Sequence, residues 1–154
     1  MKLFVVAVGH RMPAWVDAGF AEYAARMPRE MRVELIALKP AARSAGTGRA
    51  VESEGKRIRA AVPAGCTTVA LDERGAPFTT TELARRLARW RQSGHSIAFL
   101  VGGADGLAED VKKSSDAVWS LSALTLPHGL ARVVLAEQLY RAASILHNHP
   151  YHRE

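Results

Sequence analysis

Five short apolar segments that alternate with helical spacing constrain the fold of this chain more than any other feature. The first, residues 3–8, is an unbroken β-prone run that ends at Gly9, as in a strand buried on both faces. The other expected strands cover residues 33–38, 67–71, 96–101 and 118–120, and the expected helices cover residues 14–27, 50–62, 79–93, 108–115 and 130–146. This alternation predicts an α/β fold with a mostly parallel sheet.

The length and composition are those of a small globular protein. The chain has 154 residues, of which 48% are hydrophobic and 23% are charged, so we expect one domain over residues 1–154. No apolar run approaches the roughly 20 residues that span a bilayer. The run at 3–8 is too short for a signal peptide, which favours a cytoplasmic protein with no membrane partner. A single cysteine, Cys66, excludes a disulfide within one chain and a cysteine-based zinc site.

The charge balance favours a polyanionic partner. The 21 Lys and Arg residues outnumber the 15 Asp and Glu residues, which gives a net charge of +6 and points to RNA or DNA. A generally basic bacterial protein without such a partner would show the same balance. The basic residues are scattered along the chain, so any RNA-binding surface must be assembled by folding or by dimerisation.

Three loops are candidate ligand-binding segments, because ligands of open α/β sheets bind beyond the carboxyl ends of the strands. They follow Leu71, Val101 and Ser120. The turn at 102–106 has three glycines, which allow a close approach of backbone to a ligand, but it lacks both the dinucleotide-binding and the phosphate-loop spacing. The loop at 121–128 can offer backbone groups to an adenine edge, although a loop that only crosses the core is the simpler interpretation.

The last expected helix is apolar on more than one face. We therefore expect one face to pack on the sheet and another on a second copy of the chain, giving a homodimer, unless flanking loops cover it. Glu137 and Arg141 stand four residues apart on this helix, a spacing that indicates an ion pair along the helix as the simplest interpretation.

The tail after this helix combines aromatic, basic and imidazole groups. Three histidines, His147, His149 and His152, lie within six residues, but no acidic or sulfur ligand joins them, so a metal site is the weaker interpretation. Tyr151 can stack on a base and Arg153 can pair with a phosphate or a base anion. A frayed terminus is the alternative.

Three stretches of the sequence carry a resemblance to a known family. They are MKLFVVAVGHRMPAWV at residues 1–16, LVGGADGL at 100–107 and WSLSALTLPHGLARVVLAEQLYRAASILHNHPYHRE at 119–154. Over its whole length, and most weakly between residues 39 and 64, the chain resembles the RlmH-type ribosomal RNA large-subunit methyltransferases of the SPOUT superfamily.

The resemblance implies a fold and a cofactor. The fold would be an α/β sheet with helices on both faces, in which the C-terminal segment threads a loop to form a trefoil knot, a rare feature in proteins. S-adenosylmethionine would bind in that knot at the interface of a homodimer, and no metal is expected. The implied cofactor contacts are Leu71, Gly103, Leu121, Ser122, Ala123, Leu124, Thr125 and Leu126.

The resemblance also implies a substrate and roles for the tail. The family methylates N3 of a pseudouridine in a stem-loop of large-subunit rRNA, within the assembled ribosome. Arg153 would stabilise the base anion, His152 would act as base or proton relay, and Tyr151 would stack on or orient the base. Arg141 and Glu137 are further candidates, because a helix that lines the knot would place them near the pocket.

Two other functions fit the same pattern less well. One is a SPOUT methyltransferase that acts on tRNA, and the other is a non-catalytic ribosome-binding factor with the same fold. The glycine turn, the loop at 121–126 and the tail all match the rRNA family without a departure, which favours the catalytic interpretation. A nucleotide-binding module is disfavoured because the phosphate loop is missing.

Overall fold

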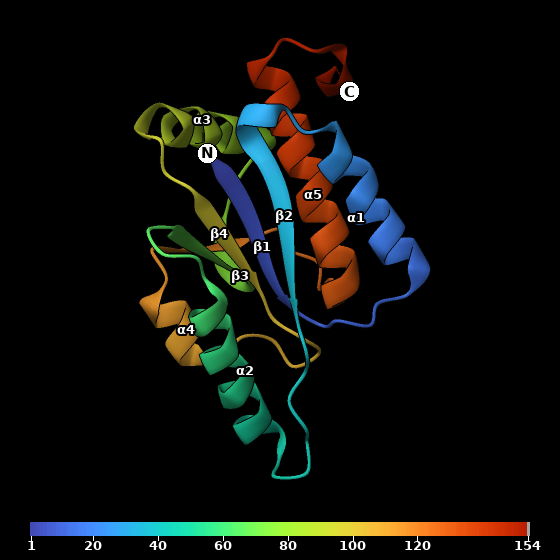
Figure 1. The fold of residues 1–154 in the computed structure, drawn as a ribbon, viewed down its shortest axis with the longest axis vertical. Coiled ribbons are helices and arrows are strands. Elements are labelled where there is room, and N and C mark those ends of the chain that lie inside the picture. Colours follow the sequence, from blue (N-terminus) through green and yellow to red (C-terminus); the bar gives the residue numbers. More distant parts are fainter. Residues whose placement is uncertain (154) are drawn as a thin grey trace.

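The computed structural model describes residues 1–153 and shows a central sheet between two layers of helices (Figure 1). The strands are β1 (Lys2–Val8), β2 (Arg32–Leu38), β3 (Thr67–Pro77), β4 (Ile97–Val101) and β5 (Ala117–Ser120). The α-helices are α1 (Ala14–Arg26), α2 (Thr47–Ala61), α3 (Thr80–Ser93), α4 (Glu109–Ser114) and α5 (His128–Leu146). Two short 3₁₀ helices are η1 (Arg29–Met31) and η2 (Pro150–His152). None of the helices in this described part is long and apolar enough to cross a bilayer.

The sheet has the strand order β2-β1-β4-β3-β5, and every neighbouring pair is parallel. This confirms the α/β fold with a parallel sheet that the alternating pattern predicts. The central strand β4 is buried along its whole length, which explains its uninterrupted apolar sequence. Because all five strands run the same way, their carboxyl ends meet along one edge.

Each face of the sheet has its own helical layer. In β1, Leu3 and Val5 belong to the core that includes residues of α1, α3 and α5, whereas Val6 and Val8 belong to the core of α2 and α4. Figure 1 shows the same division, with α2 and α4 on one side of the sheet and the other three helices on the opposite side. Successive side chains of a strand point to opposite faces, so a strand between two layers must be apolar at every position.

Strand β3 is longer than the sequence predicts. It continues past Leu71 to Pro77, and both Leu71 and Ala76 pair with Trp119, so the residues between them form a bulge. Gly75 permits this, because a Cβ there would lie 2.6 Å from the backbone carbon of Trp119. The bulge places residues 72–74 at the carboxyl edge of the sheet.

Helix α5 is fixed to the sheet by a buried cation. Arg132 is only 1% exposed, and its Nη2 donates to the carbonyls of Gly9 (3.1 Å) and Val8 (3.4 Å) at the carboxyl end of β1. Burial lowers the pKa of this guanidinium. The helix also begins at His128, two residues earlier than predicted, directly after Pro127. The N-terminal turn of α5 therefore lies over the strand ends.

The chain after α5 folds back on that helix. The rings of Tyr140 and Tyr151 lie 4.6 Å apart between centroids, and η2 follows the end of α5 (Figure 1). The trefoil knot that the resemblance implies stays a prediction.

The bulge in β3 generates a stability prediction. We expect Gly75→Ala to destabilise the fold by about 1–3 kcal/mol, because the added methyl group overlaps the backbone of β5. Urea unfolding of both proteins measures the difference. Gly48→Ala is the matched control, since a Cβ at Gly48 meets nothing within 4 Å and should be neutral or slightly stabilising in a helix. Equal midpoints for wild type and Gly75→Ala would contradict the assigned role of the glycine.

Candidate ligand-binding site

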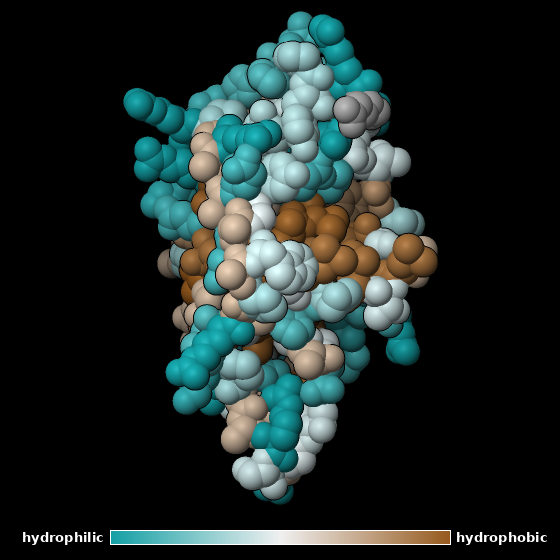
Figure 2. Space-filling view, turned by 90° about the vertical axis from the view of Figure 1, so that its right-hand side faces the viewer, coloured by the Kyte–Doolittle hydropathy of each residue, from teal (hydrophilic) through white to brown (hydrophobic). Residues whose placement is uncertain are grey.

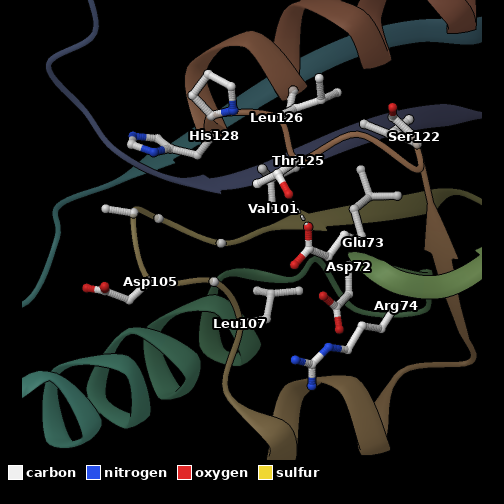
Figure 3. Close-up of a pocket in the computed structure, with 18 of the residues that line it drawn as sticks. Asp72, Glu73, Arg74, Val101, Asp105, Leu107, Ser122, Thr125, Leu126 and His128 are labelled. Carbon is white, nitrogen blue, oxygen red and sulfur yellow. Dashed lines mark hydrogen bonds between the residues drawn. The ribbon is translucent and has the colours of Figure 1, made fainter.

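A cavity of about 900 Å³ lies at the carboxyl ends of β3, β4 and β5. Figure 3 shows how side chains from the three following loops surround it. The lining residues are Leu71, Asp72, Glu73, Arg74, Val101, Gly102, Gly103, Ala104, Asp105, Gly106, Leu107, Lys112, Leu121, Ser122, Leu124, Thr125, Leu126, Pro127, His128 and Ala131. The position agrees with the sequence argument that ligands bind at this edge of the sheet.

The glycine turn forms one wall of the cavity and is tightly folded. The Gly106 N–H donates to the Gly103 carbonyl oxygen at 3.1 Å. A Cβ at Gly102 would lie 2.4 Å from the backbone carbon of Gly106, and one at Gly103 would lie 3.0 Å from the Val8 side chain. A side chain at Gly102 would overlap the backbone and one at Gly103 would have to displace Val8, so backbone lines this part of the wall.

Hydroxyl groups fix the shape of the loop at 121–127, which forms the opposite wall. The Ser120 hydroxyl donates to the Ser122 carbonyl at 2.9 Å, and the Ser122 hydroxyl accepts from the Leu124 N–H at 2.9 Å. The Thr125 hydroxyl donates to the Glu73 carboxylate at 2.7 Å, which is the dashed line in Figure 3. This last bond ties the loop to the bulge of β3.

Most of the predicted cofactor contacts gather in this cavity. Those that line it are Leu71, Gly103, Leu121, Ser122, Leu124, Thr125 and Leu126. Ala123 lies in the same loop but is not among the lining residues. The role of all eight in holding a cofactor stays a prediction.

The charged residues of the cavity are the ones that the sequence analysis missed. Asp72 accepts from Lys112 at 3.0 Å, and Lys112 also pairs with Glu109 at 2.8 Å. These two carboxylates raise the pKa of Lys112 against the opposing effect of burial. The available signal was the charged run at 72–74 directly after the apolar part of β3.

None of the five predicted catalytic residues lines the cavity. Glu137 and Arg141 lie in the middle and the second half of α5, and Tyr151, His152 and Arg153 follow its end. Glu137 joins two of the others, because its carboxylate accepts from the Tyr151 hydroxyl at 3.1 Å and from Arg141 Nε at 2.8 Å. The Arg141 guanidinium stands 4.8 Å from the centroid of the Tyr151 ring. Burial and hydrogen bonds to Tyr23 and Glu137 raise the pKa of Tyr151 well above its ordinary value.

The expectation that α5 would bring Glu137 and Arg141 to the cavity is not met within one chain. Only the start of the helix, His128 and Ala131, lines the cavity, and Glu137 and Arg141 follow His128 by a helical rise of about 14 and 20 Å. Figure 1 shows the tail folded back beside the upper end of α5. The ion pair of Glu137 and Arg141 (2.7 Å) confirms the simpler interpretation of their spacing.

The tail histidines make separate contacts. His147 pairs with Glu30 at 3.1 Å, and His149 Nδ1 accepts from the Tyr151 N–H at 3.2 Å. Over residues 1–153 the structure has no group of three His, Cys, Asp or Glu side chains placed to hold a metal ion.

His128 generates a pH prediction. Burial and the nearby Arg132, partly offset by Glu54, lower the pKa of His128 in the fold. As the pH falls below about 6.5, the unfolded chain therefore takes up a proton before the folded chain does, and the free energy of unfolding decreases. Urea unfolding between about pH 7.5 and pH 5.5 should show this decrease.

We expect His128→Gln to reduce that pH dependence. The exposed His95 supplies the control, because His95→Gln should leave the pH dependence close to that of wild type. An unchanged slope in His128→Gln would mean that this histidine does not contribute.

Comparisons with known proteins give the family. A family model described as "Predicted SPOUT methyltransferase" matches residues 1–152. The chain is 55% identical over 157 residues to the "Ribosomal RNA large subunit methyltransferase H" of Burkholderia cenocepacia, covering 99% of both chains. It is also 55% identical over 155 residues to the protein of the same name from Ralstonia pickettii, again with 99% of each covered.

Solved structures agree on the fold. A probable methyltransferase from Bordetella pertussis superposes with a TM-score of 0.59 at 15% identity, covering 92% of this chain and 95% of that one. A probable methylase family protein from Haemophilus influenzae gives 0.54 at 13% identity, covering 97% and 69%. The family match over nearly the whole chain and the relatives at more than half identity together establish that this protein belongs to the SPOUT methyltransferase family.

Proposed function

We propose that this protein uses S-adenosylmethionine to methylate N3 of a pseudouridine in large-subunit rRNA. It acts as a single domain in a homodimer, on assembled ribosomes in the cytoplasm. The observation that carries the proposal is the cavity formed by a glycine turn and the loop at 121–127, in a chain 55% identical to large-subunit rRNA methyltransferases. The net charge of +6 suits an RNA substrate.

The residues of the cavity fit the donor. Its volume of about 900 Å³ is within the usual range for small-molecule sites. Without side chains, Gly102 and Gly103 let the turn pack tightly against Gly106 and Val8, which leaves backbone to line this wall of the cavity. Leu71, Gly103 and the loop at 121–126 would hold the donor, and Leu71 and Leu126 supply apolar surface. When bound, the donor supplies a methyl group on a sulfonium for in-line transfer.

The tail would supply the groups that act on the base. The N3 proton would pass to the half-buried imidazole of His152. Arg153 would stabilise the anion that remains on the base, so that N3 could accept the methyl group that a bound donor supplies. Tyr151, held by Glu137 and Arg141, orients the base.

A homodimer reconciles the cavity with the distant tail. The tail lies away from the cavity of its own chain, which supports an arrangement in which the tail of a second subunit closes over it. Leu124, at the cavity, is 75% exposed, and Trp15 of α1 is 58% exposed. Figure 2 shows hydrophobic side chains gathered midway along the face on the α1 and α5 side. Partly exposed Leu130 and Val134 of α5 also suit a covered interface.

Donor binding and the site of methylation test the proposal. Calorimetry should detect one S-adenosylmethionine per chain in wild type and none in Gly102→Ala, whose Cβ would overlap Gly106. Mass spectrometry of rRNA from cells without the gene should show the loss of one methyl group from a large-subunit pseudouridine. Loss of a methyl group from tRNA instead would favour the tRNA enzyme, and an unchanged methylation pattern would favour a non-catalytic ribosome-binding factor.

If the tail acts on the base, a substitution in the tail should slow methylation without weakening donor binding. Arg153→Ala should lower the methylation rate by at least about 100-fold, because the base anion loses its stabilising charge, while the Kd for the donor stays within about 2-fold. Single-turnover assays and calorimetry measure the two quantities. An equal loss of both would contradict the role of Arg153.

Mixed dimers then show which subunit supplies the tail. A dimer of one Arg153→Ala chain and one Gly102→Ala chain holds one intact cavity facing one intact tail only if the tail acts on its partner. We expect about half of the wild-type activity in that dimer and little in either variant homodimer. Inactive mixed dimers would place the tail on its own chain.

A further inference from the structure

One guanidinium links the 39–46 segment to the glycine turn. Arg43 Nη1 donates to the Ala41 carbonyl at 2.8 Å, and the Nε and Nη2 of the same side chain donate to Asp105 Oδ2 at 3.3 and 2.9 Å. Arg43 is outside the cavity, whereas Asp105 lines it. Figure 3 shows the Asp105 carboxylate at the cavity edge, pointing away from Glu73 and Thr125. The 39–46 segment does not line the cavity, but Arg43 joins it by hydrogen bonds to the 102–106 turn, which does.

The other partner of Arg43 is a buried carboxylate. Glu54 of α2 is 2% exposed, and its Oε2 accepts from the Ala41 N–H at 3.0 Å and from Arg43 Nη1 at 2.8 Å. Its second oxygen, Oε1, has no hydrogen-bond partner among residues 1–153. A buried carboxylate is unfavourable unless it is paired, and Arg43 is the charged side chain within ion-pair distance of Glu54 among residues 1–153.

Glu54 lies directly behind the glycine turn. A Cβ at Gly103 would stand 3.8 Å from Glu54 Oε1, on the side where Val8 already comes within 3.0 Å. The backbone at Gly103 is therefore backed by Val8 and Glu54, and its free side is the side of the cavity. Arg43 completes this support, because it holds the carboxylate of Glu54 and that of Asp105 at the same time.

We propose that Arg43 and Glu54 are positioning residues for the methyl donor, which hold the 102–106 turn in its binding shape from outside the cavity. The proposal rests on the donor site of the preceding section. An isolated surface ion pair such as Arg43 with Asp105 would contribute little by itself. The buried Glu54 changes this, because its charge is shielded from water and fixes the guanidinium between the two carboxylates.

Calorimetry with S-adenosylmethionine and with S-adenosylhomocysteine tests the proposal on the full-length chain. Arg43→Met and Asp105→Asn should each raise the Kd about 10-fold, and the double variant should bind no more weakly than the worse single variant. In methylation assays Arg43→Met should raise the KM for the donor and leave kcat near wild type. Multiplied effects in the double variant would show that Arg43 and Asp105 act independently, against the proposal.

Arg57→Met is the matched control. Arg57 is exposed and Arg43 is partly exposed. Arg57 binds the same segment by donating to the Lys39 carbonyl at 2.9 Å, but no contact of Arg57 with the 102–106 turn is found among residues 1–153. The Kd of the Arg57→Met variant for S-adenosylmethionine should stay within about 2-fold of wild type. An equal loss in both variants would attribute the effect to charge or to the loop as a whole and would overturn the proposal.

Hydrogen exchange supplies a readout that needs no donor. Arg43→Met should speed exchange of the Gly106 amide, whose bond to Gly103 closes the turn, while the amides of β4 keep their wild-type rates. Unchanged exchange at the turn would overturn the positioning role. If wild type does not bind the donor and Arg43→Met still exchanges faster at the turn, Arg43 does hold the turn, and the proposed function is wrong instead.

Discussion

Parallel pairing of all five strands is the constraint on which the other features of this protein depend. It gathers the carboxyl ends of β3, β4 and β5 at one edge, so three loops far apart in sequence enclose a single cavity. Each parallel strand is also reached by a crossover that passes over one face of the sheet, and the crossovers here use both faces, with α1 and α3 on one and α2 and α4 on the other. Arg132 fixes the relation between α5 and this edge by binding the carbonyls of Val8 and Gly9. The geometry of the site thus follows from the sheet and from one buried cation.

The strand positions and the location of the cavity could be predicted from sequence, because both follow from simple rules. A strand buried on two faces is apolar at every position, and ligands bind at the carboxyl edge. The extension of β3 could not be predicted, since its polar residues pair with β5 only where Gly75 lets the two backbones approach. The buried state of Arg132 also escaped prediction, because its acceptors are backbone carbonyls more than 120 residues away in the chain.

The sequence predicts some contacts among the candidate catalytic residues but not their distance from the cavity. The spacing of Glu137 and Arg141 fixes their ion pair within the helix, and the tail brings Tyr151 to the same carboxylate. Their distance from the cavity depends on where α5 begins on the sheet and on how the tail folds back, and residue spacing encodes neither. The sequence therefore predicts which of these groups contact one another more securely than how they lie relative to the cavity.

The contacts that hold Tyr151 on α5 have a thermodynamic consequence. The ring packs on Tyr140 and its hydroxyl is bound by Glu137, so the segment up to η2 is already ordered in the lone subunit. A segment ordered beforehand loses little conformational entropy when it meets another surface. In the proposed homodimer, ordering of the chain end would therefore take little of the free energy of association.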